Sequence, residues 1–325
     1  MKIALAVVIP NFNHAHYLSD SLNSLMNQTR PPDRIIVVDD ASTDNSIAVL
    51  EESRKRYGCI DIIRNEKNFG VVASTMRGLE AVTEEFVFMM AADDILMPTF
   101  FEESLALLMQ NPQANLCVAH SAFLIGKNID SNNRIKKPCE NSQYLSPDRV
   151  LKALQEKKLW IPGHTAVYRT HAFRNEGAYI PELKWYSDWF LVYSMALRKG
   201  LCYIPEPLAA FRLLHESYSA KGRRDHKIVA EIIWNILNLL NSPKYLDVKE
   251  KFLASTLLHR WKEFQHEIKD NPNPWQSWKP RIKLFGAGGK INLATKKFLY
   301  SVGGEELLGF ARLQYQRLAN FVATR

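Results

Sequence analysis

The segment Phe86–Pro98 constrains the fold of this 325-residue chain more than any other part. Its first seven residues, Phe86–Ala92, are all apolar, and two adjacent carboxylates, Asp93 and Asp94, follow them directly. Such a run is typical of a central strand in a parallel sheet that is covered on both faces. Two like charges at its carboxyl end are destabilising unless a cation neutralises them. Ligands of open α/β sheets bind at this edge, so the pair predicts a site for a hard divalent metal and for a phosphate that the metal carries.

Strand and helix patterns alternate through the first 110 residues. Short apolar runs predict strands, and the residues between them repeat at helical spacing. The predicted strands are Ile3–Ile9, Arg34–Val38, Asp61–Arg64 and Phe86–Met90, and the predicted helices are Tyr17–Asn27, Ser42–Tyr57, Val71–Val82 and Pro98–Gln110. Repeated β-α units predict an α/β fold, with a mostly parallel sheet flanked by helices.

The pattern becomes mixed after residue 115 and almost wholly helical after residue 220. The predicted strands here are Leu116–Ile125, His164–Arg169, Leu201–Ile204 and Ala209–Leu213, the predicted helices are Ser146–Gln155, Ser187–Lys199, His226–Leu240 and Val248–Ile268, and the polar segment 126–145 is predicted as a loop. We therefore predict a catalytic domain of residues 1–220, followed by a basic, mainly helical region of residues 221–325.

Positive charge is concentrated in that C-terminal region. Residues 221–325 contain 19 Lys and Arg against 9 Asp and Glu, whereas the whole chain has a net charge of +8. Two interpretations stay open: a solvated helical surface, or attraction to an anionic membrane face or a phosphate-bearing acceptor. Nucleic acid is not expected as a partner, because no recognition motif accompanies the charge.

The chain has no sequence signature of a membrane span or of a secreted protein. No segment has the roughly 18 consecutive apolar residues of a membrane helix. The apolar start of the chain is short, lacks a cleavage site and is better read as a first strand than as a signal peptide. The four cysteines are scattered and include no CxxC pair, which is typical of a reducing compartment. A cytoplasmic protein is predicted, with contact at the inner membrane face as the alternative that the basic region allows.

Polar motifs follow each of the first four predicted strands. The first, Val8–Asn13, has no Gly-rich turn, which argues against a dinucleotide-binding Rossmann domain. A lone Asp at a strand end is usually a helix cap, and this explanation suffices for Asp44. It does not account for two Asp-Asp pairs, at Asp39-Asp40 and Asp93-Asp94, along one edge of a sheet.

In their order these motifs resemble those of glycosyltransferase family 2, whose members have the GT-A fold. The resemblance covers roughly the first 215 residues. The matching segments are Pro10-Asn-Phe-Asn13, Val37-Val-Asp-Asp-Ala-Ser-Thr-Asp44, Asn68-Phe-Gly70 and Ala92-Asp-Asp-Ile-Leu-Met-Pro98. The resemblance implies an inverting glycosyltransferase that moves a sugar from a nucleotide-diphosphate donor, most simply a UDP-sugar, to an acceptor hydroxyl.

The resemblance also assigns roles at the donor site. It implies that Pro10 and Asn13 line the base and ribose pocket, that Asp40 hydrogen-bonds the base, and that Asn68 belongs to the same site. Asp93 would face the ribose and, with Asp94, the metal, Mg²⁺ or Mn²⁺. Such an ion offsets the charge that builds on a diphosphate leaving group, and one or two carboxylates suffice to hold it.

The chain departs from the family pattern in two places. The usual Asp-Ala-Asp-Asp is Ala91-Ala-Asp-Asp94 here, and the usual Arg-Asn is replaced by Thr75-Met76, with Arg77 one position later. These changes bear on the nucleotide contacts more than on the class of reaction.

On the acceptor side, Lys184-Trp-Tyr-Ser-Asp-Trp189 resembles the family's acidic motif, with Ser187 in place of a Glu. The resemblance makes Asp188 the general base that deprotonates the acceptor hydroxyl, and one base is enough for a single inverting displacement. The alternative is that Asp188 only complements the dipole of its helix. The tryptophans beside it could stack on a sugar ring or belong to the core.

The segment Phe211–Ser219 resembles the family's mobile lid. Arg212 or His215 would contact the donor diphosphate there, although a surface His is the commoner case. The expected acceptor is a glycan or a lipid-linked molecule in bacterial surface glycan synthesis. A catalytically silent sugar-nucleotide-binding or scaffold protein is the alternative, because Ala91 stands where an acid is usual. A nucleotidyltransferase is disfavoured, since no Gly-rich loop follows the first strand.

Overall fold

A computed structural model of the chain describes residues 3–126, 128–131, 136–213, 218–255 and 257. The chain forms two compact units, Met1–His215 and Glu216–Arg325. The sequence pattern predicts a division after residue 220. Each unit is described by itself.

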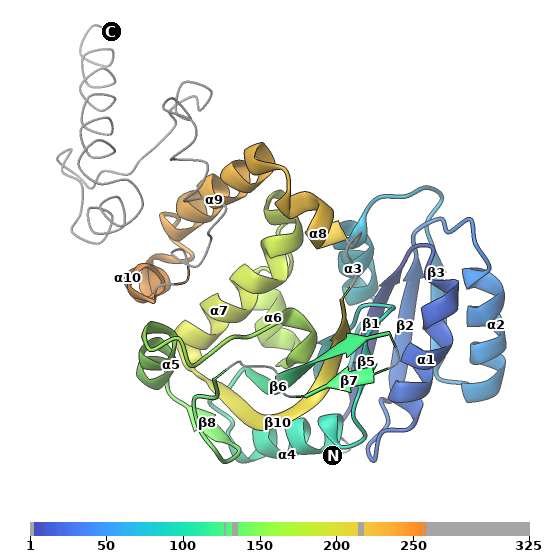
Figure 1. Ribbon diagram of the computed structural model, residues 1–325, viewed down its shortest axis with the longest axis horizontal. Helices are drawn as coiled ribbons and strands as arrows, with labels where there is room; N and C mark the ends of the chain where they lie inside the picture. Colours follow the sequence, from blue (N-terminus) through green and yellow to red (C-terminus); the bar gives the residue numbers. More distant parts are fainter. Residues whose placement is uncertain (1–2, 127, 132–135, 214–217, 256, 258–325) are drawn as a thin grey trace, which may run out of the picture. The chain divides into compact units, whose positions relative to one another are not determined.

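The first unit is built on one sheet (Figure 1), whose strands follow the order β3-β2-β1-β4-β9-β6-β10-β5, with β7 beside β6 and β8 beside β10. The strands are β1 Leu5–Asn11, β2 Arg34–Asp39, β3 Ile60–Arg64, β4 Phe86–Met89, β5 Ile95–Leu96, β6 Leu116–Ile125, β7 Asn128–Asp130, β8 Gln143–Leu145, β9 Ala166–Arg169 and β10 Leu201–Arg212. Strands β3, β2, β1 and β4 are all parallel, so their carboxyl ends share one edge.

The other half of the sheet is mixed. Strand β9 runs antiparallel to both of its neighbours, β4 and β6, whereas β6 and β10 are parallel to each other. The predicted α/β class is confirmed, and the parallel arrangement is confined mainly to the part where β-α units repeat.

The helices of the first unit are α1 Ala15–Met26, α2 Ser46–Tyr57, α3 Val71–Glu80, α4 Phe100–Gln110, α5 Pro147–Gln155, α6 Thr170–Glu176 and α7 Ser187–Lys199, with short 3₁₀ turns at Gly163–Thr165 and Pro181–Tyr186. Alternate residues of β1 face opposite sides of the sheet. Leu5, Val7 and Ile9 join the core cluster that includes α1 and α4. Val8 faces α3 at Gly78, where an added Cβ would lie 2.4 Å from Val8 Cγ1. Helices therefore cover both faces of the parallel strands.

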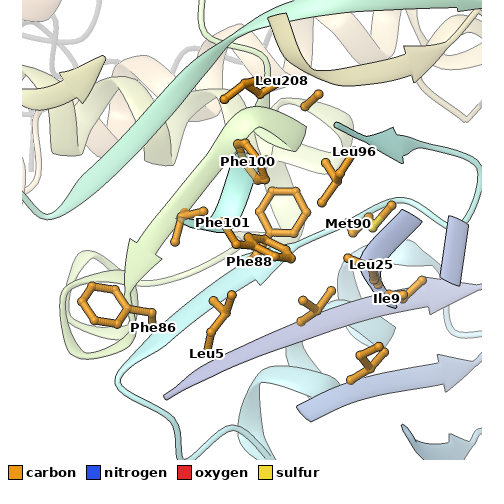
Figure 2. Packing of buried hydrophobic residues seen from close by; sticks show 14 of the residues in the cluster. Leu5, Ile9, Leu25, Phe86, Phe88, Met90, Leu96, Phe100, Phe101 and Leu208 are labelled. Carbon is orange, nitrogen blue, oxygen red and sulfur yellow. The ribbon is translucent and has the colours of Figure 1, made fainter. Parts of the chain in front are cut away.

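Aromatic rings from β4 and α4 pack together in the core (Figure 2). Phe88 meets Phe100 and Phe101 edge-on, with ring centroids 5.2 and 5.4 Å apart. Leu5, Ile9 and Leu25 pack in the same cluster (Figure 2). Burial of each large side chain of this kind contributes about 1.5–3 kcal/mol to stability. The cluster therefore stabilises β4, the strand that Asp93 and Asp94 follow.

The structure differs from the predicted elements in several ways, and it also contains the short strand β5, which the sequence pattern does not predict. The segments Leu201–Ile204 and Ala209–Leu213 are parts of one strand, β10, which continues through irregular register around Pro207. The predicted loop 126–145 contains the short strands β7 and β8, and α6 has no counterpart among the predicted helices. Pro and polar residues hide these strands in the sequence pattern. The strands form all the same, because pairing with neighbouring strands overrides local propensity.

In the second unit the structure describes helices α8 Tyr218–Arg223, α9 His226–Leu240 and α10 Leu246–Ala254. Helix α9 has the predicted bounds, and its buried side chains recur at helical spacing: Val229, Ile232, Ile233, Ile236 and Leu240. The predicted helix Val248–Ile268 begins at Leu246, and its part beyond residue 257 lies outside the described residues. None of the helices in the described part of the chain is long and apolar enough to cross a membrane.

Candidate functional site

The structure brings the predicted donor-side residues to one edge of the sheet. Pro10 lies on β1 opposite Val38 of β2, and Asp40 follows β2 directly. Asn68 lies in the loop between β3 and α3, and Asp93 and Asp94 follow β4. Because these strands are parallel, all of these positions lie at the carboxyl ends where α/β proteins bind ligands.

Asp40 is buried and organises the loop after β3. Its Oδ1 accepts hydrogen bonds from Asn65 Nδ2 (2.6 Å) and the Phe69 backbone N–H (2.9 Å), and its Oδ2 accepts from the Gly70 N–H (2.8 Å). An ionised carboxylate has about four lone-pair sites, so three of them are used within the protein. A contact with the nucleotide base stays a prediction, and little of this side chain's acceptor capacity is left for it.

Asn65 is the residue of this corner that the sequence reasoning missed. Besides Asp40 it donates to Ser74 Oγ (2.9 Å), and its Oδ1 accepts from the Arg77 guanidinium. Arg77, one position after the place of the family's Arg-Asn, is tied through Asn65 to Asp40.

Asn13 joins the loops after β1 and β2. Its backbone has a left-handed φ of 57°, its Oδ1 accepts from the Thr43 N–H (2.8 Å), and its own N–H donates to Ser42 Oγ (3.0 Å). Asp44 accepts from the Ala15 N–H at the start of α1 and from the Ser46 N–H at the start of α2 (both 2.9 Å). The second helix therefore begins at Ser46 and not at Ser42. The role of Asn13 towards a ribose is still a prediction.

Asp93 and Asp94 form a carboxylate pair with few hydrogen-bond donors. Asp94 is only 5% exposed, and its Oδ1 accepts from the Arg212 backbone N–H (3.1 Å). Burial, and then the charge of Asp93, raise the pKa of Asp94 well above its ordinary value. Burial also raises the pKa of Asp93, although His14, Arg212 and His16 oppose that shift. Among the described residues, no side chain donates a hydrogen bond to either carboxylate.

These two carboxylates fit a hard divalent cation. Their raised pKa values mean that the protein itself does not compensate both negative charges. Within the described part of the chain, no group of three or more His, Cys, Asp or Glu gathers as a metal cage. Mg²⁺ is usually held by one or two carboxylates together with phosphates and water, so this donor set suits an ion that arrives with a diphosphate.

Arg212 lies beside the pair, and its predicted contact with the diphosphate stays a prediction. It ends β10, its Nε donates to the Asp93 backbone carbonyl (3.1 Å), and its Nη1 donates to the Gly126 carbonyl (2.7 Å). The guanidinium carbon lies 4.4 Å from the centre of the Tyr17 ring. A fixed positive charge is thus held beside the two carboxylates. His215 lies outside the described residues.

Large apolar side chains are exposed along the same edge. Phe12 is 41% exposed, Phe69 53% and Val71 39%. They follow β1 and β3, on either side of the loop after β2. Exposed apolar groups among convergent polar ones are typical of small-molecule sites, and a nucleobase is a suitable flat ligand.

Asp188 lies in the first turn of α7. Its Oδ1 accepts from the Trp189 N–H (2.7 Å), and its carboxylate packs against Gly163, where an added Cβ would lie 2.2 Å from Asp188 Oδ2. Burial first, and the charge of Asp188 among the further causes, raise the pKa of Tyr168 and of Tyr179. The general-base role is a prediction that this placement allows.

Ser187 has a structural part in the acceptor-side motif. Its hydroxyl accepts a hydrogen bond from the Ile180 N–H, which closes the segment before α7. Trp185 and Trp189 are half-buried beside it, and Trp160 contacts the Phe211 ring with centroids 6.0 Å apart. The Ser in place of the family's Glu therefore fixes the loop and supplies no second acid.

A short run of contacts links the two acidic sites. The Arg212 backbone N–H donates a hydrogen bond to Asp94 Oδ1. The preceding residue, Phe211, packs against the His164 ring, with ring centroids 4.7 Å apart. His164 Nε2 also lies 3.1 Å from Ser121 Oγ of β6. The next residue back, Gly163, touches Asp188. The 3₁₀ turn Gly163–Thr165 therefore lies between the carboxylate pair and the acceptor-side acid.

The fold and the position of the site define an α/β protein whose candidate ligand site lies at the carboxyl ends of parallel strands, and comparison with known families gives its family. Residues 6–177 match the model of glycosyl transferase family 2. That match covers more than half of the chain. The chain belongs to glycosyltransferase family 2.

Its relatives include glycosyltransferases of bacteria. An uncharacterised glycosyltransferase of Haemophilus influenzae is 26% identical over 223 residues, which cover 64% of this chain and 65% of the relative. One of Nostoc sp. is 29% identical over 220 residues, 66% and 65% of the two chains. The poly(ribitol-phosphate) beta-N-acetylglucosaminyltransferase TarS of Staphylococcus aureus is 26% identical over 180 residues, 54% of this chain and 29% of TarS. The aligned region thus spans less than two thirds of the length of these relatives.

Solved structures confirm the GT-A fold. TarS residues 1–349 in complex with UDP-GlcNAc superpose with a TM-score of 0.66 at 16% identity, covering 94% of this chain and 82% of that one. The mannosyltransferase PcManGT of Pyrobaculum calidifontis, in complex with GDP-Man and Mn²⁺, superposes with a TM-score of 0.55 at 15% identity, covering 97% and 85%. At these identities the likeness concerns the fold.

Proposed function

We propose that this protein transfers a sugar from a nucleotide-diphosphate donor, a UDP-sugar foremost, to an acceptor hydroxyl with inversion at the anomeric carbon. The observation that carries the proposal is the Asp93-Asp94 pair, which is short of donors and lies beside Arg212 at the carboxyl edge of the sheet. The contacts through Phe211 and His164 to Gly163 and Asp188 support an acid on the acceptor side.

On the donor side, Asp93 and Asp94 would hold Mg²⁺ or Mn²⁺, which when bound offsets charge on the leaving diphosphate. Arg212 supplies a fixed positive charge next to that position. Phe12, Phe69 and Val71 offer apolar surface to the base. The solved complexes of TarS with UDP-GlcNAc and of PcManGT with GDP-Man support a donor of this class.

On the acceptor side, the Asp188 carboxylate takes the proton of the acceptor hydroxyl. The hydroxyl oxygen forms a bond to the anomeric carbon as the bond from that carbon to the diphosphate oxygen breaks, and the electron pair leaves with the nucleoside diphosphate. One displacement inverts the configuration. A positioned base of this kind contributes about 10²–10⁴-fold to the rate.

We infer an acceptor that is a glycan or a lipid-linked precursor in bacterial surface glycan synthesis. The names of relatives such as TarS and the putative teichuronic acid biosynthesis glycosyltransferase TuaG of Bacillus subtilis support this class. The basic region 221–325 would add attraction to an anionic membrane face at the cytoplasmic side. Sedimentation with anionic liposomes at low and high salt tests this part: binding that is absent at low salt contradicts it.

A donor screen tests the main proposal. UDP- and GDP-sugars are added with Mn²⁺ or with EDTA, and thermal unfolding is followed, because a ligand that binds only the folded state raises the Tm. We expect one donor class to raise the Tm in a metal-dependent way. Transfer or hydrolysis of the labelled donor is then measured for the wild type and for Asp188→Asn.

Donor binding and donor turnover, measured together, distinguish a glycosyltransferase from a catalytically silent binding protein. Loss of transfer in Asp188→Asn, with donor binding kept, supports Asp188 as the general base. Metal-dependent donor binding without any turnover in the wild type would instead identify a silent sugar-nucleotide-binding protein. No stabilisation by any nucleotide-sugar contradicts both.

A further inference from the structure

We propose that Gly163 is a positioning residue for Asp188: the missing side chain at residue 163 sets where the acceptor-side carboxylate lies. This inference rests on the proposed function, because it takes Asp188 as the general base. It assigns to the 3₁₀ turn Gly163–Thr165 a part in catalysis that the family resemblance and the motifs do not assign.

The contact between the two residues is exceptionally close. A Cβ added at Gly163 would lie 2.2 Å from Asp188 Oδ2 and 2.9 Å from both Cβ and Cγ of Asp188. Real Cβ atoms are essentially never found within 3.0 Å of another heavy atom. All three nearest atoms belong to one side chain, that of Asp188. An alanine here therefore acts on this carboxylate before it acts on anything else.

The turn itself cannot move away from Asp188 without breaking other contacts. Thr165 Oγ1 donates to the Pro162 carbonyl (2.9 Å), and the Ile161 N–H donates to Tyr193 Oη of α7 (2.9 Å). His164 lies against Phe211 and near Ser121, on β10 and β6. The turn is thus held from both sides, by the helix that carries Asp188 and by the strands next to the Asp93-Asp94 pair.

A rotation of the Asp188 side chain relieves the contacts with Oδ2 and Cγ and leaves only the Cβ contact at 2.9 Å, which a small shift relieves. Its carboxylate is the far end of a short side chain in the first turn of α7, and the residue is half-buried. A different χ1 rotamer would keep the helix and the fold but would move the carboxylate oxygens. Misplacement of a catalytic group by about 1 Å lowers a rate by about 100-fold.

The test compares Gly163→Ala with Gly58→Ala in the full chain. Gly58 ends α2 just before β3, so it lies at the opposite edge of the sheet from the candidate site. Its φ is +70°, and an added Cβ meets nothing within 4 Å. Gly58→Ala should lower the Tm and leave kcat within about twofold. Gly163→Ala should lower kcat by about 100-fold, with the KM for the donor and the donor-induced rise in Tm unchanged.

A double-mutant cycle with Asp188→Ala keeps the proposal falsifiable even if Gly163→Ala folds poorly. Asp188→Ala removes the contacts with Oδ2 and Cγ and keeps only the one at 2.9 Å with Cβ, so Gly163→Ala should lower the Tm clearly less in the Asp188→Ala background than in the wild type, with no further effect on the residual rate. An equal loss of Tm in both backgrounds overturns the proposal, because the alanine then collides with something other than the Asp188 carboxylate.

The outcomes also separate this inference from the proposed function. If Asp188→Asn keeps full transfer activity, the general-base assignment fails, and with it the reason to expect a catalytic effect at Gly163. If Asp188→Asn is inactive but Gly163→Ala keeps more than half of wild-type kcat, only the inference about Gly163 is overturned.

Discussion

The two Asp-Asp pairs at the edge of the sheet have almost the same local sequence and opposite surroundings. Asp39 accepts hydrogen bonds from Asn11 Nδ2 (2.8 Å) and the Ser42 N–H (3.0 Å), and Asp40 accepts three more. For Asp93 and Asp94 the one hydrogen bond between a carboxylate and another described residue comes from the Arg212 backbone. The first pair is therefore a structural organiser of loops, and the second is the pair that a cation would complete.

Burial alone does not distinguish the two pairs of carboxylates. Asp39, Asp40 and Asp94 are all nearly inaccessible to solvent. A buried carboxylate with several N–H donors stabilises the fold, whereas one beside a second negative charge destabilises it until a ligand arrives. Substitutions at the two pairs should therefore have opposite effects on stability and on activity.

The largest expected effect is on activity, at Asp94. Asp94→Asn keeps an oxygen that can accept from the Arg212 N–H but removes a buried negative charge. Transfer activity should fall by at least about 100-fold, since metal stabilisation of a leaving group is worth several kcal/mol. The Tm of the metal-free protein should stay the same or rise. Initial rates at saturating Mn²⁺ and thermal scans in EDTA measure the two effects, and Asp20→Asn, at an exposed position of α1, is the matched control.

The next effect is on stability, at Asp40. Asp40→Ala leaves the Phe69 and Gly70 N–H groups and the Asn65 amide without their acceptor. The free energy of unfolding should fall by about 3 kcal/mol, because buried hydrogen bonds to a charged group contribute about 1.5–3 kcal/mol each and are not additive. Urea unfolding measures it, with Asp20→Ala as the control. A change within about 0.5 kcal/mol would show that Asp40 does not organise this loop.

The effect of Asp94→Asn on the stability of the metal-free protein should depend on pH. Burial and Asp93 raise the pKa of Asp94 above its value in the unfolded chain. Ionised Asp94 therefore destabilises the metal-free protein at neutral pH, and this effect vanishes where both states are protonated, below the ordinary carboxyl pKa of about 3.9. The stability that Asp94→Asn gains over the wild type should be largest at pH 7–8 and should shrink as the pH falls towards 4. Urea unfolding in EDTA across this range measures it, and a gain that is independent of pH would contradict the assignment.

The smallest effect is expected at Asn13. Asn13→Gly keeps the left-handed backbone that this position requires but removes the acceptor of the Thr43 N–H. The free energy of unfolding should fall by about 1 kcal/mol, as for one hydrogen bond. A fall in donor affinity that exceeds this loss, measured by titration of the nucleotide-sugar, would mean that Asn13 also contacts the donor. Equal changes would mean that it only holds the two loops together.

The elements with strong periodicity could be predicted from the sequence alone. Leu116–Ile125, Ser187–Lys199 and His226–Leu240 have the predicted bounds. Elements whose sequence contains breakers could not: Pro205 and Pro207 split the pattern of β10, which its partner β6 keeps as one strand. A strand is stabilised by its neighbours as much as by its own residues.

The candidate site follows the same division. The edge of the sheet and the acids on it could be predicted, because parallel strands place all their carboxyl ends together. The parts of Asn65, Tyr17 and Gly163 could not, because each acts through a residue far away in the sequence. Asn65 bonds a residue 25 positions before it, and Tyr17 lies under Arg212. A glycine such as Gly163 carries no chemical signal at all until its neighbour is known.

The sequence by itself determined the α/β class, the family and the edge at which the acids gather, since these depend on local periodicity and on short motifs at strand ends. Only the tertiary structure decided which Asp-Asp pair is satisfied by hydrogen bonds within the protein and which has few donors. Asp40 receives its donors from a loop 25 to 30 positions away, and Asp94 receives its one backbone donor from a residue 118 positions away. The charge balance of a buried carboxylate depends on what the fold packs around it, and two neighbouring letters in a sequence do not contain that information.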